Sequence, residues 1–471
     1  MCNPYQKLID SVRGKAVAVL GLGVSNLPLT RLLLSLGAAK SITVYDKKGI
    51  DELDGEARAL ADAGVRFVRG FENINADVIF RSPGIRPDID GIRAACERGA
   101  VLTSEIEMLL NLTAAKTFAL TGSDGKTTST TLTGEFLGRG YTTFVGGNIG
   151  TPLLDRYAEM TDRDCVVLEL SSFQLMTLDD APECAAITNL SPNHLDWHSD
   201  LDEYAAAKRH IVGERTKRVV LNAECAYTLD FGKELLASGG KEVIFFSSKA
   251  KAFCDVSGIV GAKLLYLKDG AITITDGREE RVLLDTSLIR IPGMHNVENY
   301  MTAIGLTYGF VDTEVYSTVA KEFLGVEHRL ELVRTIDGVD FYNSSIDSSP
   351  TRTAAALSAL GGRDTVVICG GYDKNLSYAP LATSLCKSVR AAVLTGATAP
   401  KIMAALECCD DYDPTRLTVV MTESFEEAVS TAASLGRADG CVLLSPASAS
   451  FDRFKNFMER GRYFKELVSK L

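Results

Sequence analysis

Long uncharged apolar runs, CxxC pairs and clusters of basic residues are all missing from this sequence. The uncharged stretch from Ala16 to Thr30 is interrupted by glycine, asparagine and proline, and it is too short to span a bilayer. The 11 cysteines are dispersed, which is typical of reduced cytosolic thiols and not of a disulfide or zinc framework. The first residues lack the apolar core of a signal peptide. We therefore expect a cytoplasmic protein that is not inserted into a membrane.

Basic residues are too scattered for a surface that binds nucleic acid. The formal net charge is -11, and Lys and Arg form no stripe that would neutralise a phosphate backbone. We therefore expect no nucleic-acid partner, and we expect a monomer. An anionic substrate is still compatible with this charge, because backbone N–H groups, a few basic side chains and metal ions can hold phosphate on an acidic protein.

Apolar strands alternate with helical stretches in three successive blocks of the chain. A chain of 471 residues is too long for one hydrophobic core, and this alternation predicts parallel α/β sheets. We predict an N-terminal Rossmann-like domain at 1–112, a central P-loop ATPase-like domain at 113–325 and a C-terminal Rossmann-like α/β domain at 326–471. The predicted strands lie at 16–21, 41–46, 76–80, 116–120, 165–170, 185–190, 365–369, 391–394, 417–421 and 441–444, and a helix is predicted from Asn26 to Leu36.

The first predicted strand leads into a glycine-containing turn, GLGVSN, that begins at Gly21. It resembles the dinucleotide fingerprint with Asn26 at the position of the third glycine, and Asp46 ends the next strand, where such folds often contact a ribose. The same turn serves any diphosphate or a tight bend, so a nicotinamide site is one of several interpretations.

A stronger phosphate-binding pattern, TGSDGKTT, follows the strand at 116–120. A strand, a glycine turn and a helix start present several backbone N–H groups to one anion. Lys126 is expected to contact the outer phosphates, and the Thr127 hydroxyl is of the kind that joins a magnesium shell. The pattern is shorter than the full P-loop, with Leu120 where its first glycine would be. A glycine-rich turn capped by threonines is the alternative, but strand, turn, lysine, hydroxyl and helix occur together in order.

Carboxylate and imidazole groups follow the next two predicted strands. Glu169 ends one of them, beside the strand of the phosphate loop, where a carboxylate can hold magnesium or simply be solvated. The segment NLSPNHLDWH then gathers His194, Asp196, Trp197 and His198, in a chain with 5 histidines. His194 is a candidate magnesium ligand or substrate contact, whereas Trp197 and His198 are as readily explained by packing.

Three further segments are ambiguous when taken from the residues alone. Lys208 lies in a predicted helix, YAAAKRHI, where nothing separates it from a solvated lysine. Asn296 and Asn299 lie on one face of another predicted helix and could present amides to a base or sugar, but Asn296 could equally cap that helix. Arg329 falls at the predicted boundary between the second and third domains, where it could reach a γ-phosphate on domain closure or be a surface arginine of a linker.

The last motif, LLSPASASFDRFKNFMERG, predicts a buried strand, a serine-rich tip and an amphipathic helix. Phe451, Phe454 and Phe457 are spaced along that predicted helix and are more typical of a core than of a site. Ser448 and Ser450 could cap the helix and bind a carboxylate at its N-terminus.

Taken together, these segments resemble the Mur ligases of peptidoglycan synthesis. The resemblance covers nearly the full chain and is carried by SPGIR, TGSDGKTT, GGNIG, ELSSFQL, NLSPNHLDWH, AAKRHI, GMHNVENY, HRLE and LSPASASFDRFKNFMERG. ELSSFQL and the SPASASFDRFKNF ending are the most specific pieces, and the phosphate loop is the least specific. Within the family, the motifs are most similar to those of the members that add D-glutamate.

The resemblance implies substrates, cofactors and a site. It implies ATP with two Mg²⁺ ions, UDP-N-acetylmuramoyl-L-alanine and D-glutamate, and it displaces the nicotinamide interpretation. Catalytic roles are implied for Lys126, His194, Lys208 and Arg329, and magnesium ligation for Thr127, Glu169, His194 and Lys208, of which Lys208 would be carbamylated. A carbamate replaces an ammonium that repels Mg²⁺ with an oxygen anion. ATP contacts are implied for Gly122, Ser123, Asp124, Gly125, Lys126, Thr127, Thr128, Asn296, Asn299 and Arg329. UDP-substrate contacts are implied for Val24, Ser25, Asp46, Lys47, Ser82 and Asn148, and D-glutamate contacts for Ser348, Lys374, Ser450, Phe451 and Phe457.

The sequence departs from the family pattern in two places. Asp124 stands where the family usually has Asn, which adds a negative charge near the phosphates and would be tolerated with metal bound or with the side chain turned outward. In NSSIDSSP at 343–350, Ser344 replaces an Asp and Ile346 a Lys, so nucleotide contacts in this segment are in doubt. Asp347 is a candidate substitute for the missing carboxylate.

The expected reaction is amide formation through an acyl phosphate. ATP phosphorylates the alanyl carboxylate, Lys126, Arg329 and magnesium spread the charge of the transition state, and the amine of D-glutamate attacks. Another Mur ligase or a folylpolyglutamate-synthase-like ligase is the nearest alternative, although the DNPR motif of diaminopimelate-adding enzymes is missing. From other classes, a noncatalytic nucleotide-binding protein and a dinucleotide-dependent oxidoreductase are alternatives.

Overall fold

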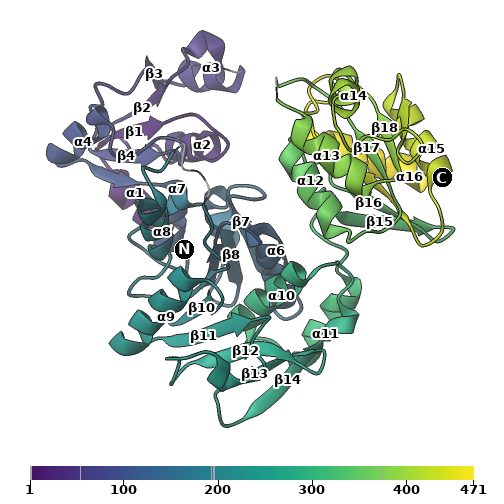
Figure 1. Ribbon diagram of the computed structural model, residues 1–471. Coiled ribbons are helices and arrows are strands. Elements are labelled where there is room, and N and C mark those ends of the chain that lie inside the picture. The colour runs from purple at the N-terminus through teal and green to yellow at the C-terminus, as the bar shows by residue number, and fades with distance from the viewer. Residues whose placement is uncertain (1–2, 54, 193, 195–196, 375) are drawn as a thin grey trace. The chain divides into compact units, whose positions relative to one another are not determined.

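The computed structural model describes residues 3–53, 55–192, 194, 197–374 and 376–471 (Figure 1). The chain divides into two compact units. The first unit comprises Met1–Thr286 with Val297–Val319, and the second comprises Ser287–Asn296 with Ala320–Leu471. Three sheets, dominated by parallel strands, give the mixed α/β class that the alternation of strands and helices predicts.

The first sheet is parallel, with the strand order β3-β2-β1-β4-β5. Its elements are α1 (Gln6–Val12), β1 (Ala16–Leu20), α2 (Asn26–Leu36), β2 (Ser41–Asp46), α3 (Gly55–Asp62), β3 (Arg66–Arg69), β4 (Val78–Arg81), α4 (Asp90–Glu97), β5 (Val101–Thr103) and α5 (Glu105–Leu112), with a short 3-10 turn at Ile50–Glu52. The predictions of β1, α2, β2 and β4 are confirmed. Strands β3 and β5 are short edge strands that the sequence did not reveal.

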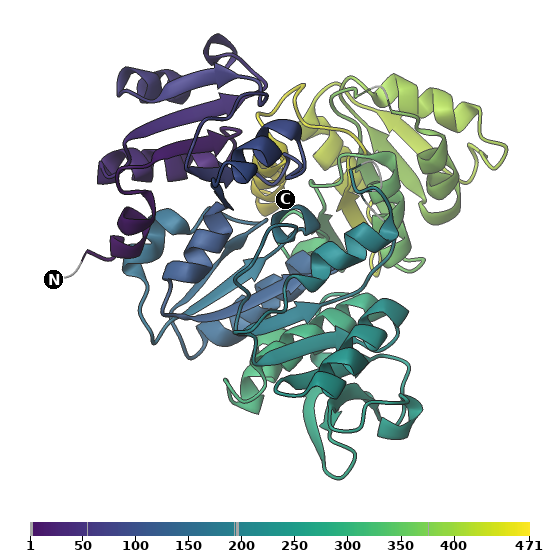
Figure 2. The ribbon, with the colours of Figure 1, turned by 90° about the vertical axis from the view of Figure 1, so that its left-hand side faces the viewer.

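Both faces of the first sheet are covered, because alternate residues of its strands point to opposite sides. One set packs with α1, α2 and α3, and the other packs with α4 (Figures 1 and 2). The first set includes Val17, Val19, Val78 and Phe80, and the second includes Ala18, Leu20 and Ile79. The first of these two cores continues through α5 into the second sheet, so the two sheets belong to one unit.

The second sheet has nine strands in the order β14-β13-β12-β11-β10-β9-β6-β8-β7. Strands β6 to β12 are parallel, and β13 and β14 add an antiparallel edge. Its strands are β6 (Lys116–Thr121), β7 (Thr143–Gly147), β8 (Cys165–Glu169), β9 (Cys184–Ile187), β10 (Arg218–Asn222), β11 (Glu242–Ser247), β12 (Lys263–Lys268), β13 (Ala271–Thr275) and β14 (Glu280–Asp285). Its helices are α6 (Lys126–Gly138), α7 (Ser172–Leu175), α8 (Leu201–Arg209), α9 (Ala226–Ser238), α10 (Met294–Thr307) and α11 (Thr313–Glu322), with 3-10 turns at Leu154–Glu159, Phe253–Asp255 and Thr286–Leu288.

The third sheet lies wholly in the second unit and has the order β15-β16-β20-β17-β18-β19. Only β15 runs antiparallel to its neighbour. The strands are β15 (Glu331–Ile336), β16 (Val339–Asn343), β17 (Thr365–Cys369), β18 (Ala391–Leu394), β19 (Thr418–Met421) and β20 (Cys441–Leu444). The helices are α12 (Pro350–Ala359), α13 (Ala379–Ser388), α14 (Ala399–Glu407), α15 (Phe425–Leu435) and α16 (Phe457–Ser469). The four predicted strands of this block are confirmed as β17 to β20.

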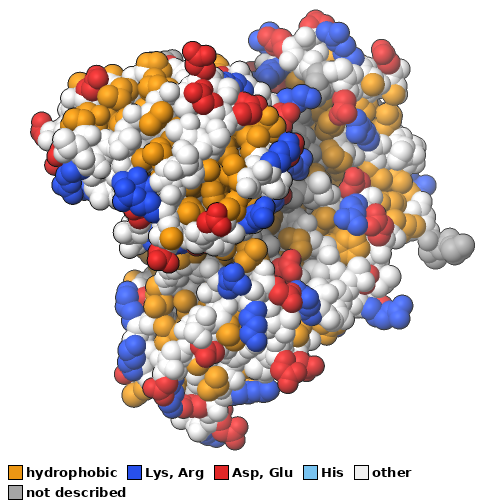
Figure 3. All heavy atoms as spheres, turned by 90° about the vertical axis from the view of Figure 1, so that its right-hand side faces the viewer, with side chains coloured by type: hydrophobic (Ala, Val, Ile, Leu, Met, Phe, Trp, Pro, Cys, Tyr) orange, Lys and Arg blue, Asp and Glu red, His pale blue; other side chains and the backbone are white. Residues whose placement is uncertain are grey.

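The surface is mixed in charge. On the face seen in Figure 3, Lys and Arg side chains are interspersed with Asp and Glu. Within the part of the chain that the structure describes, none of the helices is both long enough and apolar enough to cross a membrane.

Candidate active site

The phosphate loop lies between β6 and α6, and its shape requires glycine at two positions. Gly122 has φ 152°, and a Cβ there would meet Thr188 Oγ1 at 1.9 Å. Gly125 has φ 77°, and a Cβ there would lie 2.3 Å from Asn299 Oδ1. The Lys126 Nζ donates to the carbonyls of Gly122 and Ser123 at 2.8 and 2.9 Å. The loop is therefore already closed around its own lysine, beside the first turn of α6.

Residues after β9 hold the phosphate loop from one side. The Asp124 N–H donates to Asn189 Oδ1 at 2.9 Å, and the Thr188 hydroxyl donates to the Asp124 carbonyl at 2.5 Å. Asp124 is exposed, which agrees with the expectation that its carboxylate turns outward. The backbone of Asp124 is thus fixed, while its charge stays in water and is screened there.

Glu169 ends β8, directly beside the strand that leads into the phosphate loop. Leu120 and Glu169 are paired in the parallel register of β6 and β8. The side chain is 2% exposed, and Oε1 accepts a hydrogen bond from Asn148 Nδ2 at 2.9 Å. Its buried Oε2 has no hydrogen-bond donor. An acceptor buried without a partner is costly unless a cation or another donor reaches it.

Lys208, in the last turn of α8, is buried and not the solvated lysine that the sequence alone suggested. It is 1% exposed, because α8 packs this face against the strand of the phosphate loop. Its Nζ donates to Thr121 Oγ1 at 3.1 Å and to the Gly122 carbonyl at 2.8 Å. Burial, reinforced by the charge of Lys126, holds the pKa of Lys208 well below its usual value. Burial therefore disfavours the charged form of this amine, which the charges of Glu169 and Asp124 favour.

His194 and Lys208 both lie near the Tyr204 ring. The Lys208 Nζ is 4.6 Å from the centroid of the Tyr204 ring, and the His194 ring is 6.4 Å from the same centroid. His194 is exposed and has φ 55°, a backbone conformation that non-glycine residues adopt mainly under local constraint. Asp196, which the sequence grouped with it, lies outside the described residues.

His198 is a buried packing residue. It is 2% exposed, and burial lowers its pKa. The Glu203 carboxylate 3.2 Å from Nδ1 can only accept, so Nδ1 carries the proton and Nε2 accepts from the Ser172 hydroxyl at 2.9 Å. The centroid of the Phe173 ring lies 5.6 Å from that of His198, 4.4 Å from that of Trp197 and 5.0 Å from that of His194, so it packs against all three rings.

Some of the side chains around the phosphate loop are suitable ligands for a hard cation such as Mg²⁺. Among the described residues, no three His, Cys, Asp or Glu side chains converge as metal ligands. The set implied by the family resemblance is of another kind: the Thr127 hydroxyl, the Glu169 carboxylate, the His194 imidazole and Lys208. The buried Oε2 of Glu169, which has no donor, is the observation that favours a cation here.

In the first sheet, the side chains of the GLGVSN turn explain its sequence. Asn26 is 2% exposed, and its Nδ2 donates to the carbonyls of Leu20 and Gly21. Asn26 occupies the position of the third glycine of the dinucleotide fingerprint, and its two hydrogen bonds hold the turn closed. Asp46 accepts from the Leu22 N–H at 2.9 Å and from the Lys48 N–H at 3.0 Å, so it holds the turn and the end of β2 together.

A pocket of about 450 Å³ opens at this end of the first sheet. It is lined by Leu22, Leu27, Lys48, Glu52 and Leu53. Around the same turn, Val24 is 79% exposed and Lys47 is exposed, and a Cβ on Gly21 would touch Ser82. The carboxyl ends of β1, β2 and β4 meet here, which is the usual ligand-binding edge of such a sheet.

In the second unit, the serine-rich tip does not cap the last helix. Helix α16 begins at Phe457, and its N-cap is Asn456, whose side chain accepts from the Glu459 N–H. The prediction that Ser448 or Ser450 caps this helix is wrong, because a turn over 451–456 separates them from it. That turn also removes Phe451 and Phe454 from the helix. Phe451 is 61% exposed and lies 5.9 Å from the ring of Tyr372.

Arg460, which sequence reasoning missed, organises the expected D-glutamate region. It is 2% exposed, and its guanidinium donates to the carbonyls of Ser345, Ser448 and Ala449 at 2.8 to 3.2 Å. It therefore joins the NSSIDSSP segment to the tip that carries Ser450, which is itself buried. The sequence signal was an arginine in the first turn of an amphipathic helix, on its buried face. Of the other expected contacts, Ser348 is half-buried and Lys374 exposed.

The NSSIDSSP segment is partly buried, and its carboxylate, Asp347, is on the buried side. Asp347 is 7% exposed and accepts from the Ser445 hydroxyl at 2.8 Å. Burial raises its pKa, and the charges of Arg329 and Arg352 oppose that rise. Arg329 is half-buried, so it is not a fully exposed linker arginine. Its neighbour His328 is buried, with Nδ1 3.0 Å from Asn343 Nδ2.

The two asparagines of α10 have separate local roles. Asn299 Oδ1 accepts from the Ser129 hydroxyl at 3.2 Å, which places this amide beside the helix of the phosphate loop. The alternative that Asn296 caps α10 is wrong, because the helix begins at Met294 and Asn296 lies inside its first turn. Asn296 Nδ2 donates to the Pro292 carbonyl at 2.6 Å.

The fold and the site define an α/β protein with a phosphate loop on a parallel sheet and a buried carboxylate and lysine beside it. Residues 120–307 match the Mur ligase middle domain, and residues 328–448 match the Mur ligase glutamate ligase domain. The UDP-N-acetylmuramoylalanine--D-glutamate ligase of Clostridium beijerinckii is 44% identical over 100% of both chains. The ligase of the same name from Acetivibrio thermocellus is 43% identical over 100% of this chain and 98% of its own. The chain belongs to the Mur ligase family.

The solved structures agree at the level of the fold. The UDP-N-acetylmuramate-alanine ligase of Thermotoga maritima has a TM-score of 0.56 at 17% identity, over 97% of this chain and 99% of that one. A MurF structure from Acinetobacter baumannii has a TM-score of 0.54 at 18% identity, over 78% and 82% of the two chains.

Proposed function

We propose that this chain joins D-glutamate to UDP-N-acetylmuramoyl-L-alanine and converts ATP to ADP and phosphate, in peptidoglycan synthesis. The enzyme is a ligase, an assignment that rests on relatives of one name that match the chain from end to end. The structural observation that carries the proposal is the buried Glu169, with an oxygen that has no donor, beside the phosphate loop and the buried Lys208.

The chemistry requires activation of a carboxylate. A free carboxylate is a poor electrophile, so the γ-phosphoryl group is first transferred to the alanyl carboxylate to give an acyl phosphate. The D-glutamate amine then attacks the acyl carbon, and phosphate leaves from the tetrahedral intermediate. Lys126 and Arg329 neutralise the charge that develops on the transferred group, while the N–H groups of the phosphate loop hold it in line.

Thr127, Glu169, His194 and Lys208 would hold the magnesium ions, two in number. Bound Mg²⁺ supplies charge neutralisation for the phosphates. Lys208 would carry a carbamate, and its burial supports this because burial disfavours the charged amine and it is the neutral amine that adds CO₂. Asn148 would hold Glu169 in place through its amide and meet the muramoyl portion of the substrate.

The remaining contacts follow the three sheets. The UDP portion would lie at the turn of the first sheet, against Val24, Ser25, Asp46, Lys47 and Ser82, next to the pocket there. D-glutamate would be held by Ser348, Lys374, Ser450, Phe451 and Phe457. ATP would be held by residues 122–128 with Asn296, Asn299 and Arg329. We place the reaction in the cytoplasm and expect a monomeric enzyme.

Phosphate release with a varied amino acid tests this proposal. The purified protein is supplied with UDP-N-acetylmuramoyl-L-alanine, ATP and Mg²⁺, and then with D-glutamate, L-glutamate or no amino acid. D-glutamate should raise phosphate release well above the other two, with ADP formed in equal amount. Equal release with L-glutamate or with buffer would reject D-glutamate as the substrate. Release with a different amino acid would assign another ligase of the family.

The carbamate has its own measurement. Activity should depend on bicarbonate, and the mass of the Lys208-containing peptide after gentle handling should exceed that of the unmodified peptide by one CO₂. A Lys208→Ala variant with full activity, together with indifference to bicarbonate, would remove Lys208 from the site.

A further inference from the structure

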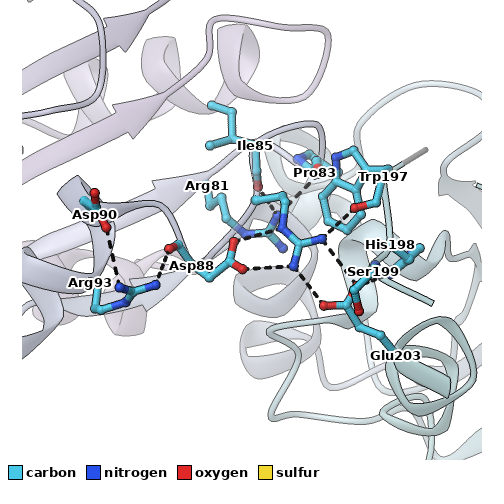
Figure 4. Close-up of polar contacts among 11 residues, drawn as sticks. Arg81, Pro83, Ile85, Asp88, Asp90, Arg93, Trp197, His198, Ser199 and Glu203 are labelled. Atoms are coloured by element: carbon cyan, nitrogen blue, oxygen red, sulfur yellow. Dashed lines mark hydrogen bonds and ion pairs between the residues drawn. The ribbon is translucent and has the colours of Figure 1, made fainter. Parts of the chain in front are cut away.

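Arg86, in the loop after β4 of the first sheet, bonds to residues that follow β9 of the second sheet. Its partners Asp88, Trp197 and Glu203 are labelled in Figure 4. Its Nη2 donates to Glu203 Oε1 at 2.8 Å, and its Nη1 donates to the Trp197 carbonyl at 2.6 Å. The guanidinium also lies 5.0 Å from the centroid of the Trp197 ring. The Nε and the same Nη2 also donate to the two carboxylate oxygens of Asp88, in the loop of Arg86 itself. One side chain thus holds both the backbone at Trp197 and the first turn of α8.

Glu203 connects Arg86 to His198 and, through His198, to Ser172. Its second oxygen, Oε2, accepts from the Ser199 N–H at 2.8 Å and lies 3.2 Å from His198 Nδ1. The other ring nitrogen of His198 lies 2.9 Å from the Ser172 hydroxyl. The hydrogen bond from Arg86 lowers the pKa of Glu203 to about 2, so this carboxylate is charged at any working pH. We call Arg86, Glu203, His198 and Ser172 the arginine relay.

Three members of the relay, Ser172, His198 and Glu203, are connected to residues proposed to bind magnesium. Ser172 begins α7, three residues after Glu169 at the end of β8. The carbonyl of His194 accepts from the N–H groups of Trp197 and His198 at 3.0 and 2.9 Å. Glu203 and Lys208 are both on α8.

The outer end of the relay lies in the segment expected to contact the substrate. Arg86 ends the SPGIR segment that begins at Ser82, a proposed UDP-substrate contact. Arg81, buried at the end of β4, braces the same segment, because its guanidinium donates to the Ile85 carbonyl at 2.6 Å and, across the sheets, to the Phe173 carbonyl at 2.8 Å. A displacement of residues 82–86 would therefore change the hydrogen bonds that Arg81 makes to α7.

We propose that Arg86 is a positioning residue that couples the substrate loop, Ser82 to Arg86, to the magnesium ligands through the arginine relay. Binding of the UDP-sugar in the first sheet would then order the metal site in the second. This inference rests on the proposed function, because the metal ligands and the substrate loop are assigned there. The competing explanation is a bridge that merely holds two sheets together. Side chains behind metal ligands commonly change metal affinity or activity 10- to 100-fold when they are removed.

Three variants are tested: Arg86→Met, Glu203→Gln, and the double variant that carries both changes. Each is compared with the control variant Arg93→Met. Arg93 is the matched control, since its guanidinium donates to the Asp88 carbonyl of the same loop and pairs with Asp90 within α4. Three quantities are measured: the Mg²⁺ concentration for half-maximal phosphate release, the KM for the UDP-substrate, and the fluorescence of Trp197. The chain has 1 tryptophan, so tryptophan emission reports on the surroundings of Trp197, which contacts Arg86.

The relay predicts a specific pattern. Arg86→Met and Glu203→Gln should each raise the half-maximal Mg²⁺ concentration by about tenfold, and the double variant should be no worse than either single variant. The KM for the UDP-substrate should rise as well, because a coupling between two binding sites acts in both directions. Adding UDP-substrate without ATP should shift Trp197 emission in the wild type and in Arg93→Met, and this shift should be lost in Arg86→Met.

Other results would overturn the coupling. If Arg86→Met lowers the thermal midpoint but keeps the Mg²⁺ requirement and the fluorescence response of Arg93→Met, Arg86 is a structural bridge only. If Arg86→Met does not fold, Arg86→Lys takes its place: it keeps the charge but loses the paired hydrogen bonds, and an unchanged Mg²⁺ requirement then rejects the proposal. Absence of D-glutamate-dependent phosphate release in the wild type would reject the proposed function instead, and the fluorescence response would decide the coupling by itself.

Discussion

Glu105, at the start of α5, is a carboxylate kept out of water in the first unit. It is 4% exposed, and Oε1 accepts from the Leu154 N–H at 3.1 Å. Burial raises its pKa from 4.5 to about 7. A raised pKa means that the folded protein binds the proton more tightly than the unfolded chain, so stability is lost as the pH rises through this window. Such a difference corresponds to about 3 kcal/mol of the free energy of unfolding.

We therefore expect Glu105→Gln to be relatively more stable than the wild type at pH 8 than at pH 4.5. Urea unfolding at a series of pH values measures the difference between the two proteins. Glu56→Gln, on the half-exposed surface of α3, is the control and should show no such trend. A difference that stays constant from pH 4.5 to 8 would mean that Glu105 ionises normally in the folded protein.

Lys208 is the second residue whose burial has a measurable consequence. A lysine whose pKa is lowered in the folded state weakens folding at every pH below the pKa of the unfolded chain. Lys208→Met, measured without metal or bicarbonate, should therefore be at least as stable as the wild type in urea. The same variant should lose at least about 100-fold in D-glutamate-dependent phosphate release. Lys217→Met, at an exposed position, should change neither quantity, and an active but destabilised Lys208→Met would contradict this account.

For single residues, the sequence indicated which side chains belong to the site, but it did not indicate how deeply they are buried. The glycines of the phosphate loop and Glu169 were predictable, because a glycine turn and a strand end restrict where their atoms lie. The burial of Lys208 was not, since the apolar face of α8 is set by what packs on it and not by the spacing within YAAAKRHI. From the sequence, Asn26 was only a departure from the third glycine of the dinucleotide fingerprint. Its two hydrogen bonds to the turn became apparent in the structure.

Helix α16 illustrates how one element fixes a site made of loops. Arg460 holds three carbonyls from two segments, and those acceptors are buried with it. Arg460→Met leaves them without a donor, which should lower the free energy of unfolding of the second unit by on the order of 3 kcal/mol. The KM for D-glutamate should rise as well, because the tip that carries Ser450 loses its anchor. The exposed Arg462→Met, on the same helix, should be close to wild type in both measurements.

Buried central strands were the elements that the sequence predicted well. β17, β18 and β20 are continuous apolar runs because both of their faces are covered. β3, with exposed arginines, and β15, with a half-exposed pattern, carry no such signal. The cap of α16 was placed too early because serine and asparagine both cap helices well, and only the turn over 451–456 decides between them.

For the whole molecule, the existence of three α/β sheets was predictable, whereas their strand orders were not. Alternating strands and helices predict a parallel sheet, but sequence order does not say that β20 lies between β16 and β17, or that β6 lies between β9 and β8. Those neighbours decide where Glu169 lies relative to the phosphate loop. The residues of the site could be proposed one by one, and their arrangement came from the pairing of the strands.

The second unit should fold by itself. All strands of its sheet, and all members of its two cores, come from residues after Ala320. A fragment of Ala320–Leu471 should therefore unfold in urea in one cooperative transition. Phe464 is 0% exposed, and Phe464→Ala should lower the fragment's free energy of unfolding by about 3–5 kcal/mol. Phe451→Ala is the matched control, because Phe451 is 61% exposed and its loss should cost less than about 0.5 kcal/mol. A fragment with helical circular dichroism but no cooperative transition would show that its packing depends on the rest of the chain.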